Sequence, residues 1–211
     1  MSYISLSDID NDKLKEAINL LWEMSIKTYD DCLKNNVMER EEYEYFLKKP
    51  AHCIKVWQIV KKITSDYDIL NHDDDKDILK CACLIHDIRK PENEHGVSGS
   101  IFFYENIDSV LSQVFQKEVG LEEAEKECVS EIVKFHNIDR DYELSSESDI
   151  DKLKKFLIIR IADKFSKYPA KSIEEVILRA EIQCENLVKI NPVLDKMKKE
   201  IEENILRYIC E

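Results

Sequence analysis

Apolar residues recur every three to four positions along most of the chain, which is the spacing of one face of an α-helix. A first helix is predicted from near Asp10 or Asp12 to beyond Tyr29, and Asn35-Asn36 breaks it. Its inward stripe is Leu14, Ile18, Leu21 and Met24. A short helix over residues 41–47 follows, and Pro50 is expected to close it. These segments carry no chemical motif, so we expect them to cover part of the core.

The helical spacing is most regular in the middle of the chain. A helix that includes His52 places four apolar residues on the same inward side, namely Val56, Ile59, Val60 and Ile63. The polar segment Asn71–Asp75 is predicted to be a loop. The stripe of the next helix is Ile78, Ala82 and His86. Pro91 and Asn93 then predict a turn, which ends this pair of helices.

Two further helices are predicted on either side of Gly120. The first begins at His95, and its small residues Ser98-Gly99-Ser100 would allow a close approach to a neighbouring helix. The second covers residues 121–135 and leaves His136 at its C-terminal end. Both helices therefore place a histidine at one end.

The last part of the chain contains recognisable helix starts. An acidic loop over residues 139–148 leads to a capping box, Ser148-x-x-Asp151, in which Asp stands in for the usual Glu. Ser172-x-x-Glu175 is a better capping box, and Pro192 begins the final helix. The helices that start at Ser172 and Pro192 are expected to serve in packing.

The composition agrees with a nearly all-helical protein. Only 3 Gly and 4 Pro occur among 211 residues, whereas 44% of the residues are apolar and 36% are charged. A chain of this length buries a sizeable core without disulfides, and no repeat or linker divides it. We therefore predict an all-α fold with a single domain over residues 1–211.

Charge and cysteine usage exclude several classes of function. The net charge of −13 argues against a nucleic-acid partner, whose phosphates require clustered Lys and Arg, although a small phosphorylated substrate needs only a local positive site. The seven cysteines lack framework spacing, so reduced thiols are expected, with Cys81 and Cys83 as small buried hydrophobes. No signal peptide or span of ~20 apolar residues is evident. These features predict a cytoplasmic protein without a membrane partner.

Six His and Asp residues fall at the ends or inward faces of the predicted helices. They are His52, His86, Asp87, His95, His136 and Asp163. Each alone has a simpler explanation as a core or cap residue, but buried His and Asp are costly unless they are paired or bind a metal. Imidazole and carboxylate ligands suit iron, manganese, nickel, cobalt or zinc, whereas no ligand-spaced cysteines support a structural zinc site. The fifth histidine, His72, lies in the acidic loop and is expected to be solvated.

The order of these residues resembles a known signature. His52 … His86-Asp87 … Asp163 is similar to the H…HD…D pattern of the HD-domain superfamily of metal-dependent phosphohydrolases. Residues 84–90, Leu-Ile-His-Asp-Ile-Arg-Lys, resemble its L-L-H-D-I-G-K segment, and residues 159–164, Ile-Arg-Ile-Ala-Asp-Lys, resemble its I-x-x-A-D-K segment. The resemblance covers about residues 48–168. It implies an HD-type helical bundle, with a metal site between the central helices and with helices from 1–47 and 172–211 packed on that core.

The resemblance also implies roles for individual residues. A first divalent metal would be bound by His52, His86, Asp87 and Asp163. Asp87 would bridge to a second metal held by His95 and His136, which resemble the extra histidines of two-metal members. Iron or manganese is favoured for one or two ions, and nickel, cobalt, zinc and magnesium stay open. A hydroxide between the ions would be the nucleophile, with Asp87 and Lys90 as catalytic residues. Further substrate contacts are assigned to Lys90, Arg89, Lys164 and Arg140.

Two departures from the family pattern matter. Arg89 stands where the family often has Gly, which would alter the turn or add a phosphate contact. The G-Y-P triplet of the cyclic-dinucleotide-degrading branch does not follow His136, which argues against that substrate.

Three functions remain open at this point. The first is hydrolysis of a nucleotide or another small phosphoester. The second is oxygen activation by a mixed-valent di-iron pair, because a branch of the same superfamily has similar ligands. The third is a nucleotide-binding sensor without turnover, although a sensor does not require the full ligand set. Lys90 favours phosphate chemistry. The substrate, the native metal and the oligomeric state are not determined by the sequence.

Overall fold

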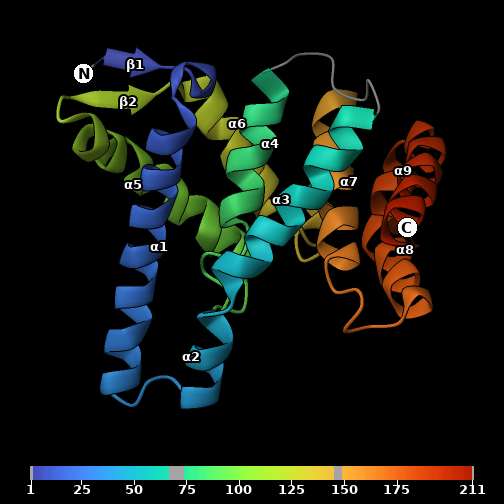
Figure 1. Cartoon of the computed structure of the whole chain (residues 1–211), viewed down its shortest axis with the longest axis horizontal. Helices are drawn as coiled ribbons and strands as arrows, with labels where there is room; N and C mark the ends of the chain where they lie inside the picture. The colour runs from blue at the N-terminus through green and yellow to red at the C-terminus, as the bar shows by residue number, and fades with distance from the viewer. Residues whose placement is uncertain (1, 67–73, 145–148, 211) are drawn as a thin grey trace.

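Long helices form almost the whole molecule (Figure 1), and the computed structural model describes residues 2–66, 74–144 and 149–210. The helices are α1 (Asn11–Lys34), α2 (Arg40–Phe46), α3 (Lys49–Asp66), α4 (Asp74–Ile85), α5 (His95–Phe115), α6 (Glu123–Lys134), α7 (Ile150–Phe165), α8 (Ile173–Ile190) and α9 (Val193–Cys210), with 3-10 turns η1 (Leu6–Asp8) and η2 (Asp141–Leu144). The prediction of a single-domain, all-α bundle is confirmed. No helix in these described ranges combines the length and the apolar character that crossing a membrane requires.

A small parallel sheet, which the sequence pattern does not predict, joins the N-terminus to the middle of the chain. Strand β1 (Ser2–Ile4) pairs with β2 (Val119–Leu121), and Tyr3 lies opposite Gly120. Figure 1 shows the two strands side by side at one end of α1. The predicted break at Gly120 is therefore the centre of a short strand. Each strand has only three residues, too few for an alternating pattern to be recognised.

The N-terminal helices begin much as predicted. Asp10 caps α1 by accepting a hydrogen bond from the Lys13 amide at 2.9 Å. The inward stripe differs at one position, because Met24 is 38% exposed whereas Ser25 is fully buried. Pro50 does not close the preceding helix but lies in the first turn of α3, where its missing N–H has no helical partner to lose.

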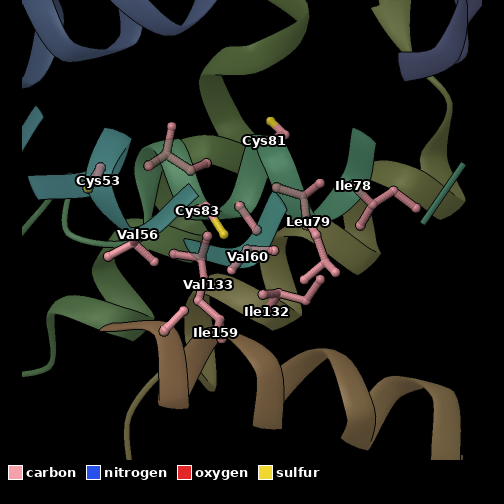
Figure 2. Close-up of a cluster of buried hydrophobic side chains, with 14 of the residues drawn as sticks. Cys53, Val56, Val60, Ile78, Leu79, Cys81, Cys83, Ile132, Val133 and Ile159 are labelled. Atoms are coloured by element: carbon pink, nitrogen blue, oxygen red, sulfur yellow. The ribbon is translucent and has the colours of Figure 1, made fainter. Parts of the chain in front are cut away.

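The core lies where α3, α4, α6 and α7 meet (Figure 2). Figure 2 shows Val56 of α3, Cys83 of α4, Val133 of α6 and Ile159 of α7 pointing toward one another. All four side chains are fully buried. Cys81 and Cys83 are small buried hydrophobes as predicted, and the six cysteines that the structure describes are free thiols. This packing holds four of the helices whose ends meet at the candidate site.

The remaining boundaries contain two corrections. Residues Asp74 and Asp75, predicted to lie in a loop, begin α4, and Asp75 pairs with Lys155 at 2.7 Å. Asp149 is the N-cap of α7 and accepts from the Asp151 amide at 3.0 Å. The predicted cap Ser148 and the predicted solvated His72 lie outside the described residues. The capping box at Ser172 is confirmed by a 3.2 Å bond from the Glu175 amide.

Candidate metal centre

Five helices bring one end each to a common point, and the six predicted ligands lie at these ends. Their positions are His52 in the first turn of α3, His86-Asp87 just after α4, His95 at the start of α5, His136 just after α6, and Asp163 in the last turn of α7. Adjacent residues on a regular helix point about 100° apart. His86 and Asp87 converge because α4 gives way here to a tight turn, closed by the Ile88 amide donating to the Ile85 carbonyl at 2.8 Å.

One carboxylate oxygen of Asp87 faces the first group of ligands. Its Oδ2 lies 3.6 Å from His52 Nε2 and 3.9 Å from His86 Nε2. Asp163 Oδ1 lies 2.9 Å from His52 Nε2 and 3.8 Å from His86 Nε2. His52, His86 and Asp87 thereby form a group that could hold one metal ion, with Asp163 beside it.

The other oxygen of Asp87 faces the second group. Its Oδ1 lies 3.5 Å from His95 Nε2 and 3.7 Å from His136 Nε2. The two Nε2 atoms of His95 and His136 are 3.0 Å apart. Asp87, His95 and His136 form a second group that could hold a metal ion, and Asp87 belongs to both.

The donor atoms are oriented as metal ligands would be. His86 Nδ1 lies 2.8 Å from the Cys83 carbonyl, and His136 Nδ1 lies 2.6 Å from the Val133 carbonyl. Because a carbonyl only accepts, each Nδ1 carries the proton and each Nε2 presents a lone pair to the centre. His86 Nε2 is buried yet makes no hydrogen bond with the described part of the chain. A buried lone pair without a donor fits a divalent metal.

At Asp87 and His95 the electrostatic environment favours the protonation states that bind a metal. Burial alone would raise the pKa of the Asp87 carboxyl, but the imidazoles of His86 and His136 and the ammonium groups of Lys90 and Lys49 hold it well below its usual range. Burial, followed by the charges of His136 and Lys90, lowers the pKa of His95 to about 3. An ionised carboxylate and a neutral imidazole bind metal without first losing a proton.

The structure brings two of the four predicted substrate-binding cations to the centre. Lys90 Nζ lies 3.3 Å from Asp87 Oδ1 and 3.0 Å from His95 Nε2. Lys164 Nζ lies 2.6 Å from Asp163 Oδ2. Both ammonium groups therefore contact predicted ligands.

The two arginines of that set have other partners. Arg89 Nε donates to Glu92 at 2.8 Å, and its guanidinium lies 4.8 Å from the ring centre of Tyr29. Arg140 donates to Glu94 at 2.5 Å and to Glu143 at 3.2 Å. A substrate role for either arginine stays a prediction, and it would require exchanging these partners.

Two further lysines, which the sequence pattern does not assign to the site, lie at the centre. Lys49 Nζ lies 3.0 Å from Asp87 Oδ2 and 2.8 Å from the Tyr45 hydroxyl, and the residue is only 3% exposed. Lys167 Nζ lies 3.1 Å from His52 Nε2 and 3.3 Å from Asp163 Oδ1. Their spacing in the sequence could have indicated this position, because each lysine lies about one helical turn from a predicted ligand and therefore on the same face of its helix.

Arg160 was also missed, although it shapes the turn that carries His136. Its Nε donates to the Phe135 carbonyl at 2.8 Å and its Nη2 to the Asn137 carbonyl at 2.7 Å. The side chain is fully buried and forms an ion pair with Asp141 at 2.5 Å. The signal was a lone charge inside the apolar run 156–162. Arg160 thereby ties down the residues on both sides of a predicted ligand.

Gly96 sets the spacing between α5 and α6 next to His136. A Cβ atom there would lie 2.7 Å from the Lys134 carbonyl oxygen and 3.2 Å from that of Val133, which orients His136. We expect Gly96→Ala to lower the free energy of unfolding by about 1–3 kcal/mol, because backbone must move. The binding of a metal ion at His95 and His136 should weaken as well. Thermal unfolding and metal analysis of purified protein measure both effects.

Gly99→Ala is the matched control, since the atom nearest to its Cβ would be a side-chain atom of Val133, at 3.2 Å, and the nearest backbone atom would be 4.0 Å away. Equal stability and metal content in the two variants would show that the approach at Gly96 does not control the second ligand group.

Comparison with known proteins agrees with this geometry. A family model described as HD domain matches residues 51–168, a segment that contains all six predicted ligands. The comparisons with curated proteins and with solved structures find no match. The family match covers more than half of the 211 residues. The chain therefore belongs to the HD domain family.

Proposed function

We propose that this protein hydrolyses a nucleotide or another small phosphoester at a centre of two divalent metal ions. The HD domain places the chain in the superfamily of metal-dependent phosphohydrolases. The observation that carries the proposal is that each oxygen of Asp87 faces its own group of imidazoles, while lysine ammonium groups surround both. This arrangement combines metal ligands with charges that suit a phosphate.

Each ion would have its own ligand set. The first set is His52, His86, Asp87 and Asp163, and the second is Asp87, His95 and His136. Iron or manganese would suit these nitrogen and oxygen donors, and nickel, cobalt, zinc and magnesium stay open. When bound, such ions activate water at neutral pH and neutralise charge that develops on the phosphoryl group. Hydrolysis then forms one P–O bond to the water oxygen and breaks the P–O bond to the leaving group, which takes up a proton.

The exposure of Lys49 and Lys90 to solvent indicates different roles for these two lysines. The Lys49 side chain is 4% exposed and stabilises ionised Asp87 from within the protein. The Lys90 side chain is 29% exposed, so its ammonium group reaches both Asp87 and the solvent side of the centre. Lys90 is therefore the residue that would bind a phosphate oxygen of the substrate.

Phosphate release from a panel of nucleotides and sugar phosphates tests the proposal, with the protein loaded with manganese or iron. We expect turnover of at least one compound, and Lys90→Gln should lower kcat/KM about 10- to 100-fold with unchanged metal content. Lys196→Gln is the control, because its side chain is 86% exposed on α9. Oxygen uptake with a mixed-valent iron signal, or tight nucleotide binding without turnover, would contradict hydrolysis.

A further inference from the structure

A second feature of the molecule is a basic pocket that adjoins the first ligand group. The pocket has a volume of about 570 Å³, within the range of small-molecule sites. Twelve residues line it, from α2, the α2–α3 connection, the first part of α3, the α7–α8 connection and α8. Six of them are basic and none is Asp or Glu. The basic residues are Lys48, Lys49, Lys55, Lys167, Lys171 and Arg179. His52 also lines the pocket, which links it to the metal centre.

This concentration of positive charge runs against the rest of the chain. The protein has 44 acidic and 31 basic residues, so a surface region of this size would ordinarily carry negative charge. Burial and the charge of Lys167 lower the pKa of Lys55. A pocket of like charges is unfavourable by itself, and a bound anion would relieve the repulsion.

The cations lie in two tiers. Lys49 and Lys167 form the inner tier, because each contacts a predicted metal ligand, Asp87 in one case and Asp163 in the other. The outer tier is Lys48, Lys55, Lys171 and Arg179. Among the described residues the outer tier is paired with a single carboxylate, that of Glu175, which lies 3.2 Å from Lys171 and 2.7 Å from Arg179.

The outer tier therefore keeps donors for an anion. Lys55 Nζ donates to the Tyr168 carbonyl at 2.6 Å, an uncharged partner that leaves its charge uncompensated. Lys48 is exposed and makes no ion pair with any residue in the described ranges. One phosphate at the metal centre would contact Lys90, and the inner tier already pairs with Asp87 and Asp163. The outer tier is therefore available for another phosphate.

We propose that the outer tier of this pocket binds a second phosphate group of the substrate. This inference rests on the proposed function. The substrate class is then a small molecule with at least two phosphates, one hydrolysed at the His/Asp centre and another held by Lys48, Lys55, Lys171 and Arg179. A nucleoside triphosphate and a sugar bisphosphate share this chemistry.

Two matched pairs of compounds test the proposal and distinguish these sources. The first pair is adenosine triphosphate and adenosine monophosphate, and the second is fructose 1,6-bisphosphate and fructose 6-phosphate. The compound with more phosphates in the responding pair should have the higher kcat/KM, by about tenfold or more. The Lys48→Gln/Arg179→Gln variant should lose about tenfold of that value, mainly through KM, and less than about twofold for the monophosphate.

The control variant is Lys189→Gln/Lys196→Gln, which removes two positive charges from exposed helix positions outside the pocket. Its kcat/KM should equal that of the unmodified protein. An equal loss of kcat/KM in both variants would show that the effect comes from net charge and not from the pocket. Equal kcat/KM values within both pairs, or losses in the pocket variant that do not depend on phosphate number, would overturn the second-phosphate site and leave the proposed hydrolysis standing.

Binding of inorganic tripolyphosphate separates failure of the pocket from failure of the function. If the metal-loaded protein hydrolyses none of the four compounds, calorimetry of tripolyphosphate binding decides the pocket. A Kd raised about tenfold in Lys48→Gln/Arg179→Gln but not in the control variant would support an anion site without the proposed hydrolysis. An unchanged Kd would overturn the site as well.

Discussion

Asp87→Asn is expected to abolish binding of both metal ions and to lower phosphohydrolase activity by about 10³-fold. Asp87 Oδ2 faces His52 and His86, whereas Oδ1 faces His95 and His136. Asparagine keeps one oxygen, loses the negative charge and turns an N–H donor toward one of the two ligand groups. Metal analysis after purification, together with phosphate release, measures the effect.

Asp75→Asn is the matched control for this substitution. Asp75 is also buried and paired with a lysine, Lys155, at 2.7 Å, but it contacts none of the predicted ligands in the described structure. It should retain metal and activity. Retention of two ions per chain by Asp87→Asn would contradict the shared role of this carboxylate.

Arg160→Met is expected to have the largest effect on stability, lowering the free energy of unfolding by about 3–5 kcal/mol. The guanidinium is fully buried and donates to Asp141 and to three backbone carbonyls, those of Phe135, Asn137 and Gln183. Methionine has a similar length but no donor. The substitution leaves the charge of Asp141 buried and three carbonyls without this partner. Urea unfolding measures the loss.

Two further variants separate this mechanism from a general loss of arginine. Arg40→Met removes an 83% exposed side chain that pairs only with Glu44 in the described structure, and it should cost less than about 1 kcal/mol. Asp141→Leu combined with Arg160→Met should recover part of the loss, because the unpaired charge is gone. If Arg160→Met were no less stable than Arg40→Met, the buried network would not hold the turn at His136.

The predicted ligands illustrate what could be known without a structure. His52, His86, Asp87 and Asp163 could be predicted as ligands because their residue types and order resemble the H…HD…D pattern of the HD-domain superfamily. The helices were identifiable for a similar reason, since a stripe such as Ile78, Ala82 and His86 reports one buried face. Boundaries were less accurate, as Pro50 and Asp74 demonstrate, because a local signal can belong to either neighbouring element.

Other features depend on contacts between residues far apart in the chain. The pairing of Ser2–Ile4 with Val119–Leu121 could not be inferred, because neither segment has a pattern of its own. Arg160 was an unexplained charge until the turn around His136 supplied its acceptors.

The sequence by itself determined the all-α fold class and most of the helices, and it supplied the residue types of the candidate metal centre. These features follow from local periodicity and from the chemistry that each side chain carries. Only the tertiary structure decided how these residues are used. In the folded chain, the two oxygens of Asp87 face separate ligand groups. Arg89 and Arg140 form ion pairs with carboxylates. Basic residues from distant segments also come together in a pocket beside His52. The physical reason is that a lysine or arginine has the same local pattern wherever it lies, and its partners are set by the packing of distant helices.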